Sequence, residues 1–122
     1  MVQIKVKVNK PVKNNVILAQ FATDIKERGG PNGNRLAMPS RFTGRLHTGV
    51  EAQVPSTHCL RVALVPDLSS RGLIMTNSGR FTVGEIYVDV LNAGREIVSV
   101  KDGDPLLEVW LEKVEKFVWE TE

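Results

Sequence analysis

Two serines and an arginine stand side by side at Ser69, Ser70 and Arg71, and a glycine follows them. Hydroxyl groups and a guanidinium beside a tight turn can bind a phosphate together, because all of them donate hydrogen bonds to anionic oxygens. The same serines also suit a simple turn, since their hydroxyls bond readily to nearby backbone groups. The sequence leaves both interpretations open, and we treat the three residues as candidate anion ligands.

Side chains for other kinds of chemistry are sparse. The two histidines, His47 and His58, have no second His or Cys at the spacing that a zinc site requires, so we predict no metal ligands. Cys59 is the single cysteine, which excludes a disulfide within one chain and fits a reducing compartment. We expect it to be a buried apolar thiol.

Length and composition indicate one domain spanning residues 1–122, because 122 residues with 42% apolar content can form one core but not two ordinary ones. The formal net charge of +2 is too small to indicate nucleic acid as a partner. No apolar stretch approaches the roughly 18 residues that cross a membrane, and the alternating N-terminus does not resemble a signal peptide. We therefore expect a cytoplasmic protein.

The pattern of apolar residues predicts short strands. Val2, Ile4, Val6 and Val8 alternate with polar residues, as in a half-buried first strand, and a second apolar run covers 16–19. A loop rich in Gly and Asn is expected at 29–34. Further strands are expected at 46–54, 59–65, 72–76, 85–91 and 97–100, and their regular spacing favours an all-β sandwich or barrel.

The C-terminal third gives conflicting local signals. Asp104-Pro105 could begin a helix, and the apolar residues of 107–118 follow helical spacing. A Gly-Asp pair before an extended segment favours a strand over 106–113 instead, on the resemblance described next. We predict the strand.

Several short patterns between Pro39 and Val114 resemble the dUTP pyrophosphatase and dCTP deaminase superfamily. They are Thr48-Gly49-Val50 with Val54-Pro55, the segment from Pro66 to Leu73, the glycines of Gly79 and Gly84-Glu85, and Gly103-Asp104. The resemblance implies a distorted jelly-roll or β-barrel domain and a homotrimer with clefts at the subunit boundaries. Trp110, Phe117 and Trp119 are the large apolar residues near the C-terminus, and their burial between subunits would support such assembly.

The catalytic positions of that superfamily are altered in this chain. Asp67 and Leu68 stand where a phosphate-binding arginine is expected, and Glu108 replaces a glutamine. Only four residues separate Gly79 from Gly84, so the hairpin has no counterpart of the aspartate that activates water. A glycine-rich tail is also missing, and Asp24 is a weak match to a magnesium-holding aspartate. We predict no catalytic residue, no metal and no cofactor.

The resemblance places the candidate ligands in two motifs. Ser69, Ser70 and Arg71 belong to the phosphate motif, whereas Asn77, Gly79 and Arg80 belong to the hairpin that faces the base. We therefore predict a catalytically degenerate trimer that binds a nucleotide or another phosphorylated small molecule, of a kind plausible in phage genomes. Two alternatives stay open. One is a magnesium-dependent pyrophosphatase that uses Asp24, Asp67 or Glu85 as its base, and the other is a trimeric capsid or tail accessory protein without a ligand.

Overall fold

The computed structural model describes residues 3–20, 27–28 and 34–121, and these residues form eleven strands and one short helix. The predicted all-β class is confirmed. In chain order the elements are β1 (Lys7–Val8), β2 (Val16–Leu18), β3 (Glu27–Arg28), β4 (Asn34–Met38), β5 (Thr43–Gln53), β6 (His58–Leu64), α1 (Pro66–Ser70), β7 (Leu73–Met75), β8 (Arg80–Phe81), β9 (Val83–Asn92), β10 (Val98–Lys101) and β11 (Pro105–Lys113).

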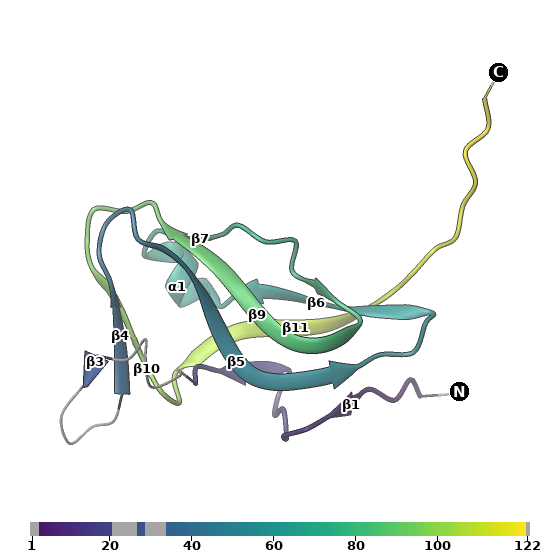
Figure 1. Cartoon of the computed structure of the whole chain (residues 1–122), viewed down its shortest axis with the longest axis horizontal. Helices are drawn as coiled ribbons and strands as arrows, with labels where there is room; N and C mark the ends of the chain where they lie inside the picture. The colour runs from purple at the N-terminus through teal and green to yellow at the C-terminus, as the bar shows by residue number, and fades with distance from the viewer. Residues whose placement is uncertain (1–2, 21–26, 29–33, 122) are drawn as a thin grey trace.

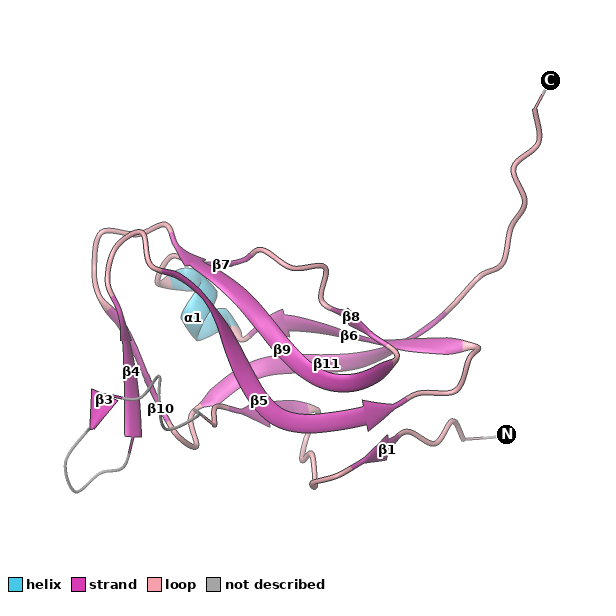
Figure 2. Cartoon of the chain, viewed as in Figure 1, coloured by secondary structure: helices cyan, strands magenta, loops and turns pink. Residues whose placement is uncertain are grey.

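The strands form three sheets. One has the order β1-β5-β9-β7, a second has the order β2-β11-β6-β8, and a small third has the order β10-β4-β3. Figure 1 shows the long curved strands β5 and β9 lying across β6 and β11, with β4 and β10 at one end of the molecule. Buried residues of all three sheets belong to one hydrophobic core. The regular strands account for most of the described chain (Figure 2).

The strand expected at 85–91 is present as part of β9, and its side chains alternate between two faces. Ile86, Val88 and Val90 are buried in the core, whereas Tyr87 and Asp89 lie on the opposite face and are half-buried. This period of two is the property of a strand whose one face is covered by a second sheet. The long antiparallel pairing of β9 with β5 then fixes which side chains stand next to each other on the outer face.

The segment over 106–113 is a strand, as predicted. Residues 107–113 pair with β6 from Leu64 to His58, and 105–108 pair with β2 on the other side. A helix would have placed Leu107, Trp110 and Leu111 on one face. In the strand, Leu107 is completely buried while Trp110 and Leu111 remain exposed. Tertiary pairing of the backbone therefore overrides the helical spacing of these residues.

The prediction of a half-buried strand over the first eight residues was wrong for most of its described part. Only Lys7 and Val8 pair with another strand, at the end of β5, and Ile4 and Val8 keep 39% and 41% of their surface exposed. Val6 packs against the core, but Ile4 and Val8 stay exposed beside Trp110 and Leu111 of β11. Alternation alone does not tell a buried face from an apolar surface.

Other features of the fold can be compared with the expectations from the sequence. Cys59 is a buried free thiol with 2% of its surface exposed, as predicted. The strand β4 was not predicted, because 34–38 carries no clear alternation. Most of the loop expected at 29–34 lies outside the described residues. Among the described residues, no helix is both long and apolar enough to span a membrane.

Candidate functional site

The helix α1 carries the first group of candidate ligands. Its backbone follows β6 directly, and Pro66 stands in its first turn, where the missing N–H has no helical partner to lose. The hydroxyl of Ser69 donates to the carbonyl of Pro66 at 3.1 Å, and that of Ser70 donates to the carbonyl of Asp67 at 2.8 Å. Both serines are exposed. Each hydroxyl can donate a hydrogen bond to an anion only if it gives up its bond within the helix.

Arg71 is also engaged within the helix. Its Nη2 lies 3.1 Å from Oδ2 of Asp67, four residues earlier, and both side chains are well exposed. The acidic residue that occupies the expected arginine position therefore neutralises the arginine that could replace it. Exposed pairs of this kind contribute little energy, so an incoming phosphate can compete for Arg71. The polar side chains of α1 are therefore accessible, and each already has a local partner.

The second group lies in the turn between β7 and β9. Asn77 uses its side-chain oxygen to accept the N–H of Asp89 at 3.0 Å, and its amide nitrogen donates to the carbonyl of Tyr87 at 3.4 Å. Gly79 has a φ of 71°, and an added Cβ would lie 2.7 Å from the carbonyl oxygen of Val62. These two residues therefore have structural roles that explain their type.

Arg80 is the remaining member of the second group. It belongs to the edge strand β8 and pairs in register with Arg61 of β6. Its Nη2 lies 3.7 Å from the sulfur of Cys59, and no ion pair involves it within the described part of the chain. Its guanidinium is thus available for a ligand or a partner.

One chain does not bring the two groups together. Arg80 is opposite Arg61, whereas α1 begins at Pro66, five residues further along the chain, or roughly 16 Å in an extended strand. Figure 2 shows α1 beyond the end of β6, whereas β8 runs beside the middle of that strand. Within the described residues, no hydrogen bond or ion pair joins the α1 group to Arg80.

The carboxylates proposed as replacement bases do not converge. Asp67 pairs with Arg71, and Glu85 lies in contact with Nδ1 of His47 on the face of β9. Asp24 lies outside the described residues. Across 3–20, 27–28 and 34–121, no group of three or more His, Cys, Asp or Glu residues could hold a metal ion.

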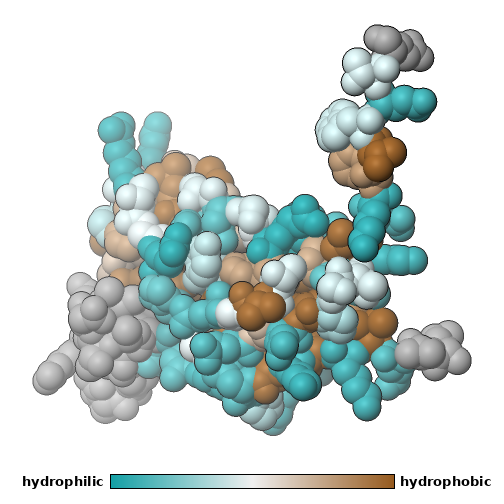
Figure 3. All heavy atoms as spheres, turned by 45° about the vertical axis from the view of Figure 1, so that its right-hand side comes forward, coloured by the Kyte–Doolittle hydropathy of each residue, from teal (hydrophilic) through white to brown (hydrophobic). Residues whose placement is uncertain are grey.

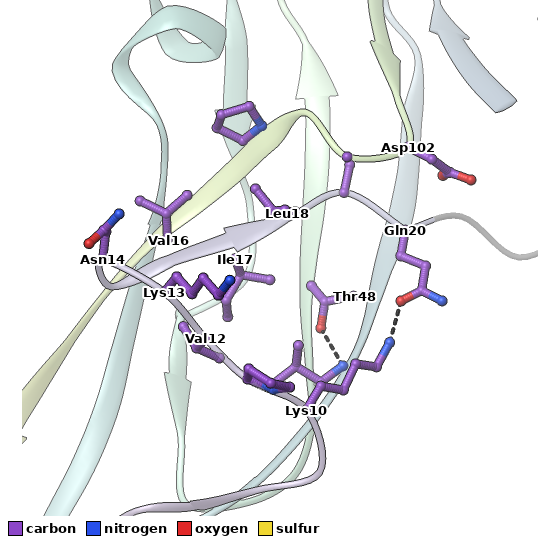
Figure 4. A pocket seen from close by; sticks show the side chains of 15 residues that line it. Lys10, Val12, Lys13, Asn14, Val16, Ile17, Leu18, Gln20, Thr48 and Asp102 are labelled. Carbon is purple, nitrogen blue, oxygen red and sulfur yellow. Dashed lines mark hydrogen bonds between the residues drawn. The ribbon is translucent and has the colours of Figure 1, made fainter. Parts of the chain in front are cut away.

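A groove of about 890 Å³ lies elsewhere, between the 10–20 segment, β5 and the turn before β11. In Figure 4, Lys10 reaches across it to Gln20, and Thr48 lies at its floor beside Ile17. The hydroxyl of Thr48 donates to the carbonyl of Ile86 at 2.6 Å and accepts the N–H of Val50 at 3.0 Å. None of the six candidate ligands lines this groove. Sequence patterns gave no signal for it because separate segments form it.

The outer face of β5 and β9 carries an ordered polar ladder. Nε and Nη2 of Arg45 lie 2.7 and 3.1 Å from the two carboxylate oxygens of Asp89, and its guanidinium stacks 3.9 Å above the ring of Tyr87. Hydrogen bonds from Arg45 lower the pKa of Asp89, and the same bonds raise the pKa of Arg45. The ring of Tyr87 is thus already covered by Arg45 and contacts Phe81 edge-on.

Comparison with known proteins identifies the fold. No family model matches the chain, and no curated protein matches it in sequence. The structure of the native dUTPase of EIAV superimposes with a TM-score of 0.65 at 17% identity, covering 97% of both chains. A variant dUTPase of S. aureus phage phi11 gives 0.66 at 13% identity over 97% of this chain and 96% of that one. A dUTPase variant of Staphylococcus bacteriophage 80alpha gives 0.66 at 11% identity, over 97% and 88%.

These matches confirm the resemblance at the level of structure. The chain has the dUTPase fold across nearly its whole length. At sequence identities of 10% to 17%, these matches establish the fold only. The function has to be argued from the residues of this chain.

Proposed function

We propose that this protein is a homotrimer with the dUTPase fold that binds a nucleotide or another phosphorylated small molecule at the clefts between subunits, without hydrolysing it. Ser69, Ser70 and Arg71 of one copy contact the phosphates. The turn that holds Asn77 and Gly79 approaches the base from a second copy, and Arg80 adds a positive charge. The assembly and the ligand are both part of this proposal.

The separation of the two groups along β6 is the observation that carries the proposal. Each group alone is a weak site, because α1 offers exposed serines with internal bonds and Asn77 is committed to the backbone of β9. The dUTPase fold provides a reason to expect both in one cleft, which is the arrangement implied by the resemblance. Arg71 then exchanges Asp67 for the ligand's phosphate, a stronger charge-assisted and bidentate partner.

The absence of hydrolysis follows from the hairpin. Arg80 and Phe81 form β8, Thr82 follows, and β9 begins at Val83, so no carboxylate is available in that short connection. A threonine hydroxyl cannot accept the proton of an attacking water at neutral pH. Asp67 and Glu85, the described alternatives, each have a cationic or imidazole partner and lie on different elements.

A thermal-shift series tests binding, and a pyrophosphate assay tests chemistry. Purified protein is heated with dUTP, dCTP, dUMP and cyclic nucleotides, each with and without magnesium. A ligand present at 100 times its dissociation constant should add about 2.7 kcal/mol of stability. We expect at least one nucleotide to raise the melting temperature, and no pyrophosphate to be released.

Two variants separate the proposal from its rivals. Arg71→Gln should abolish the ligand-induced shift, whereas Lys5→Gln, which removes an exposed cation near the N-terminus, should retain it. Pyrophosphate release would favour an active enzyme whose general base is neither Asp67 nor Glu85. A panel in which no nucleotide stabilises the wild type would favour a structural protein with empty clefts.

A further inference from the structure

A second anion site can be argued from two arginines that share one chain. Arg61 of β6 and Arg80 of β8 are direct cross-strand partners. Side chains at such positions lie on the same face of the sheet, with Cβ atoms about 5 Å apart. Two like charges so placed repel each other, so this pairing costs stability unless an anion lies between them.

Both guanidinium groups have hydrogen-bond donors without a good acceptor among the described residues. Nε of Arg61 is buried and has no hydrogen-bond partner among the described residues, and its Nη1 makes a long contact of 3.3 Å with Glu112. Arg80 reaches only the sulfur of Cys59, a weak acceptor, at 3.7 Å. A buried unsatisfied donor is unfavourable, so Arg61 loses little by turning toward a better acceptor.

The acidic residues of this face lie on one side of the arginines. Register places Glu112 opposite Cys59 and Glu108 opposite Ala63, both on β11 and therefore beyond β6 as seen from Arg80. Glu112 is paired with Arg61, while Arg80 stands on the edge strand of the sheet, where a ligand can approach it from solvent. Arg80 is thus the member of the pair whose charge no described carboxylate balances.

We infer that Arg61 and Arg80 bind the phosphate of a small molecule on the outer face of this sheet, between β6 and β8. Guanidinium groups bind phosphate with pairs of charge-assisted hydrogen bonds, which suits two arginines side by side. The inference shares Arg80 with the proposed function, yet it requires neither α1 nor a second copy of the chain. Trp110 is the cross-strand neighbour of Arg61 on β11 and can report on a larger ligand.

An NMR titration tests this site directly. The ¹⁵N-labelled full chain is titrated with inorganic phosphate at constant ionic strength, and the Nε–H signals of the arginines are followed. We expect saturable shifts for Arg61 and Arg80 and none for the exposed Arg95. A parallel titration with a nucleoside monophosphate distinguishes the source of the phosphate, since shifts of the Trp110 indole signal would show that a base lies beside it.

Variants decide between this site and the cleft at α1. Arg61→Gln and Arg80→Gln should each weaken phosphate binding about tenfold, the loss expected for one charge-assisted hydrogen bond. Arg61→Lys should bind with intermediate strength, and Arg95→Gln should bind like the wild type. Circular dichroism confirms that each variant is folded, and the exposed Arg80 provides the safer test if Arg61 variants unfold.

The inference is overturned if phosphate shifts Arg61 and Arg80 no more than Arg95, or if both glutamine variants bind as the wild type does. Arg71→Gln separates the two proposals, because it belongs only to the cleft. Loss of phosphate binding in Arg71→Gln alone would leave the proposed function standing and remove this second site. Loss of phosphate binding in Arg61→Gln, with binding retained in Arg71→Gln, would support this second site and would show that the cleft at α1 does not bind phosphate.

Discussion

Asn92 is completely buried, and its side-chain amide joins three parts of the backbone. Nδ2 donates to the carbonyls of Met38 and Glu96, both at 2.9 Å, and Oδ1 accepts the N–H of Gly94 at 3.0 Å. The amide thereby fixes the turn after β9 against the end of β4. An asparagine in a predicted turn gave no reason to expect this buried role.

Replacing Asn92 should therefore be costly for stability. Asn92→Ala leaves the carbonyl of Met38 buried without this donor, and we expect a loss of about 2–3 kcal/mol in the free energy of unfolding. Urea denaturation monitored by circular dichroism measures the change. Ser99→Ala, at an exposed position of β10, is the control and should remain within about 0.5 kcal/mol of the wild type.

Gly79 supports a second prediction about a single residue. Both its positive φ and its contact with β6 exclude a side chain, since a Cβ would lie 2.7 Å from the carbonyl of Val62. Gly103 has a φ of 90° but open space around it, so Gly103→Ala carries the conformational cost alone, about 1–2 kcal/mol. We expect Gly79→Ala to lose clearly more than Gly103→Ala in the same denaturation assay. Equal losses would mean that the contact with Val62 relaxes freely.

At the scale of elements, the ladder between β5 and β9 should make stability depend on pH. Arg45 lowers the pKa of Asp89 in the folded state, so the unfolded chain takes up a proton first as the pH falls. The stabilisation is complete above the ordinary aspartate pKa of about 3.9, and it is lost as the pH falls through the lowered value.

The variant Asp89→Asn tests this pH dependence. The free energy of unfolding of the wild type should exceed that of the variant at pH 6, and the difference should shrink below about pH 4. Arg45→Gln should remove the same pH-dependent part, and the double variant should remove no more of it. A difference that stays constant from pH 6 to pH 3 would show that Asp89 acts through packing.

The strand β11 illustrates what the sequence could and could not predict. Its residues have helical spacing, and only the resemblance favoured the strand that the pairing with β6 confirms. The strands β5, β6 and β9 were predicted from alternation and turn residues alone, because each has one face in the core. The prediction of a first half-buried strand was mostly wrong, because Ile4 and Val8 alternate with polar residues and yet remain exposed.

The burial pattern of β11 can be tested by truncating its side chains. Leu107 is completely buried, so Leu107→Ala should cost about 2–5 kcal/mol through lost burial and the cavity left behind. Leu111 pairs with Leu60 near the end of the strand and is partly exposed, so Leu111→Ala should cost clearly less. Denaturant unfolding of the two variants compares them. A helix on this segment would give them similar costs.

At the scale of the whole molecule, the candidate site was only partly predictable. Ser69, Ser70 and Arg71 form a local group because they are consecutive, which a sequence can reveal. The pairing of Arg61 with Arg80 depends on the register of β6 with β8, and no pattern in the sequence encodes that register visibly. The groove beside Lys10 likewise needs several separate segments to meet. Groups of residues that are consecutive in the sequence could therefore be predicted, whereas groups that meet only through strand pairing could not.

The C-terminal segment is the strongest structural reason to expect assembly. After β11 the chain leaves the body of the molecule (Figure 1), and apolar side chains stand on this extension (Figure 3). Phe117 and Trp119 are 73% and 88% exposed and contact mainly each other. Burying two such aromatic residues against another copy would contribute several kcal/mol, at about 25 cal/mol per Å² of apolar surface.

Light scattering should give the wild type a mass three times that of the 13.5 kDa chain. Removing residues 115–122, or replacing both Phe117 and Trp119 by serine, should shift the mass toward the monomer at low micromolar concentration, because that apolar surface is then lost from the interface. Ile97→Ser is the control, since Ile97 is an exposed apolar residue just before β10, at the other end of the molecule (Figure 1). A monomeric wild type would remove the shared clefts, while leaving the pair of Arg61 and Arg80 intact within each chain.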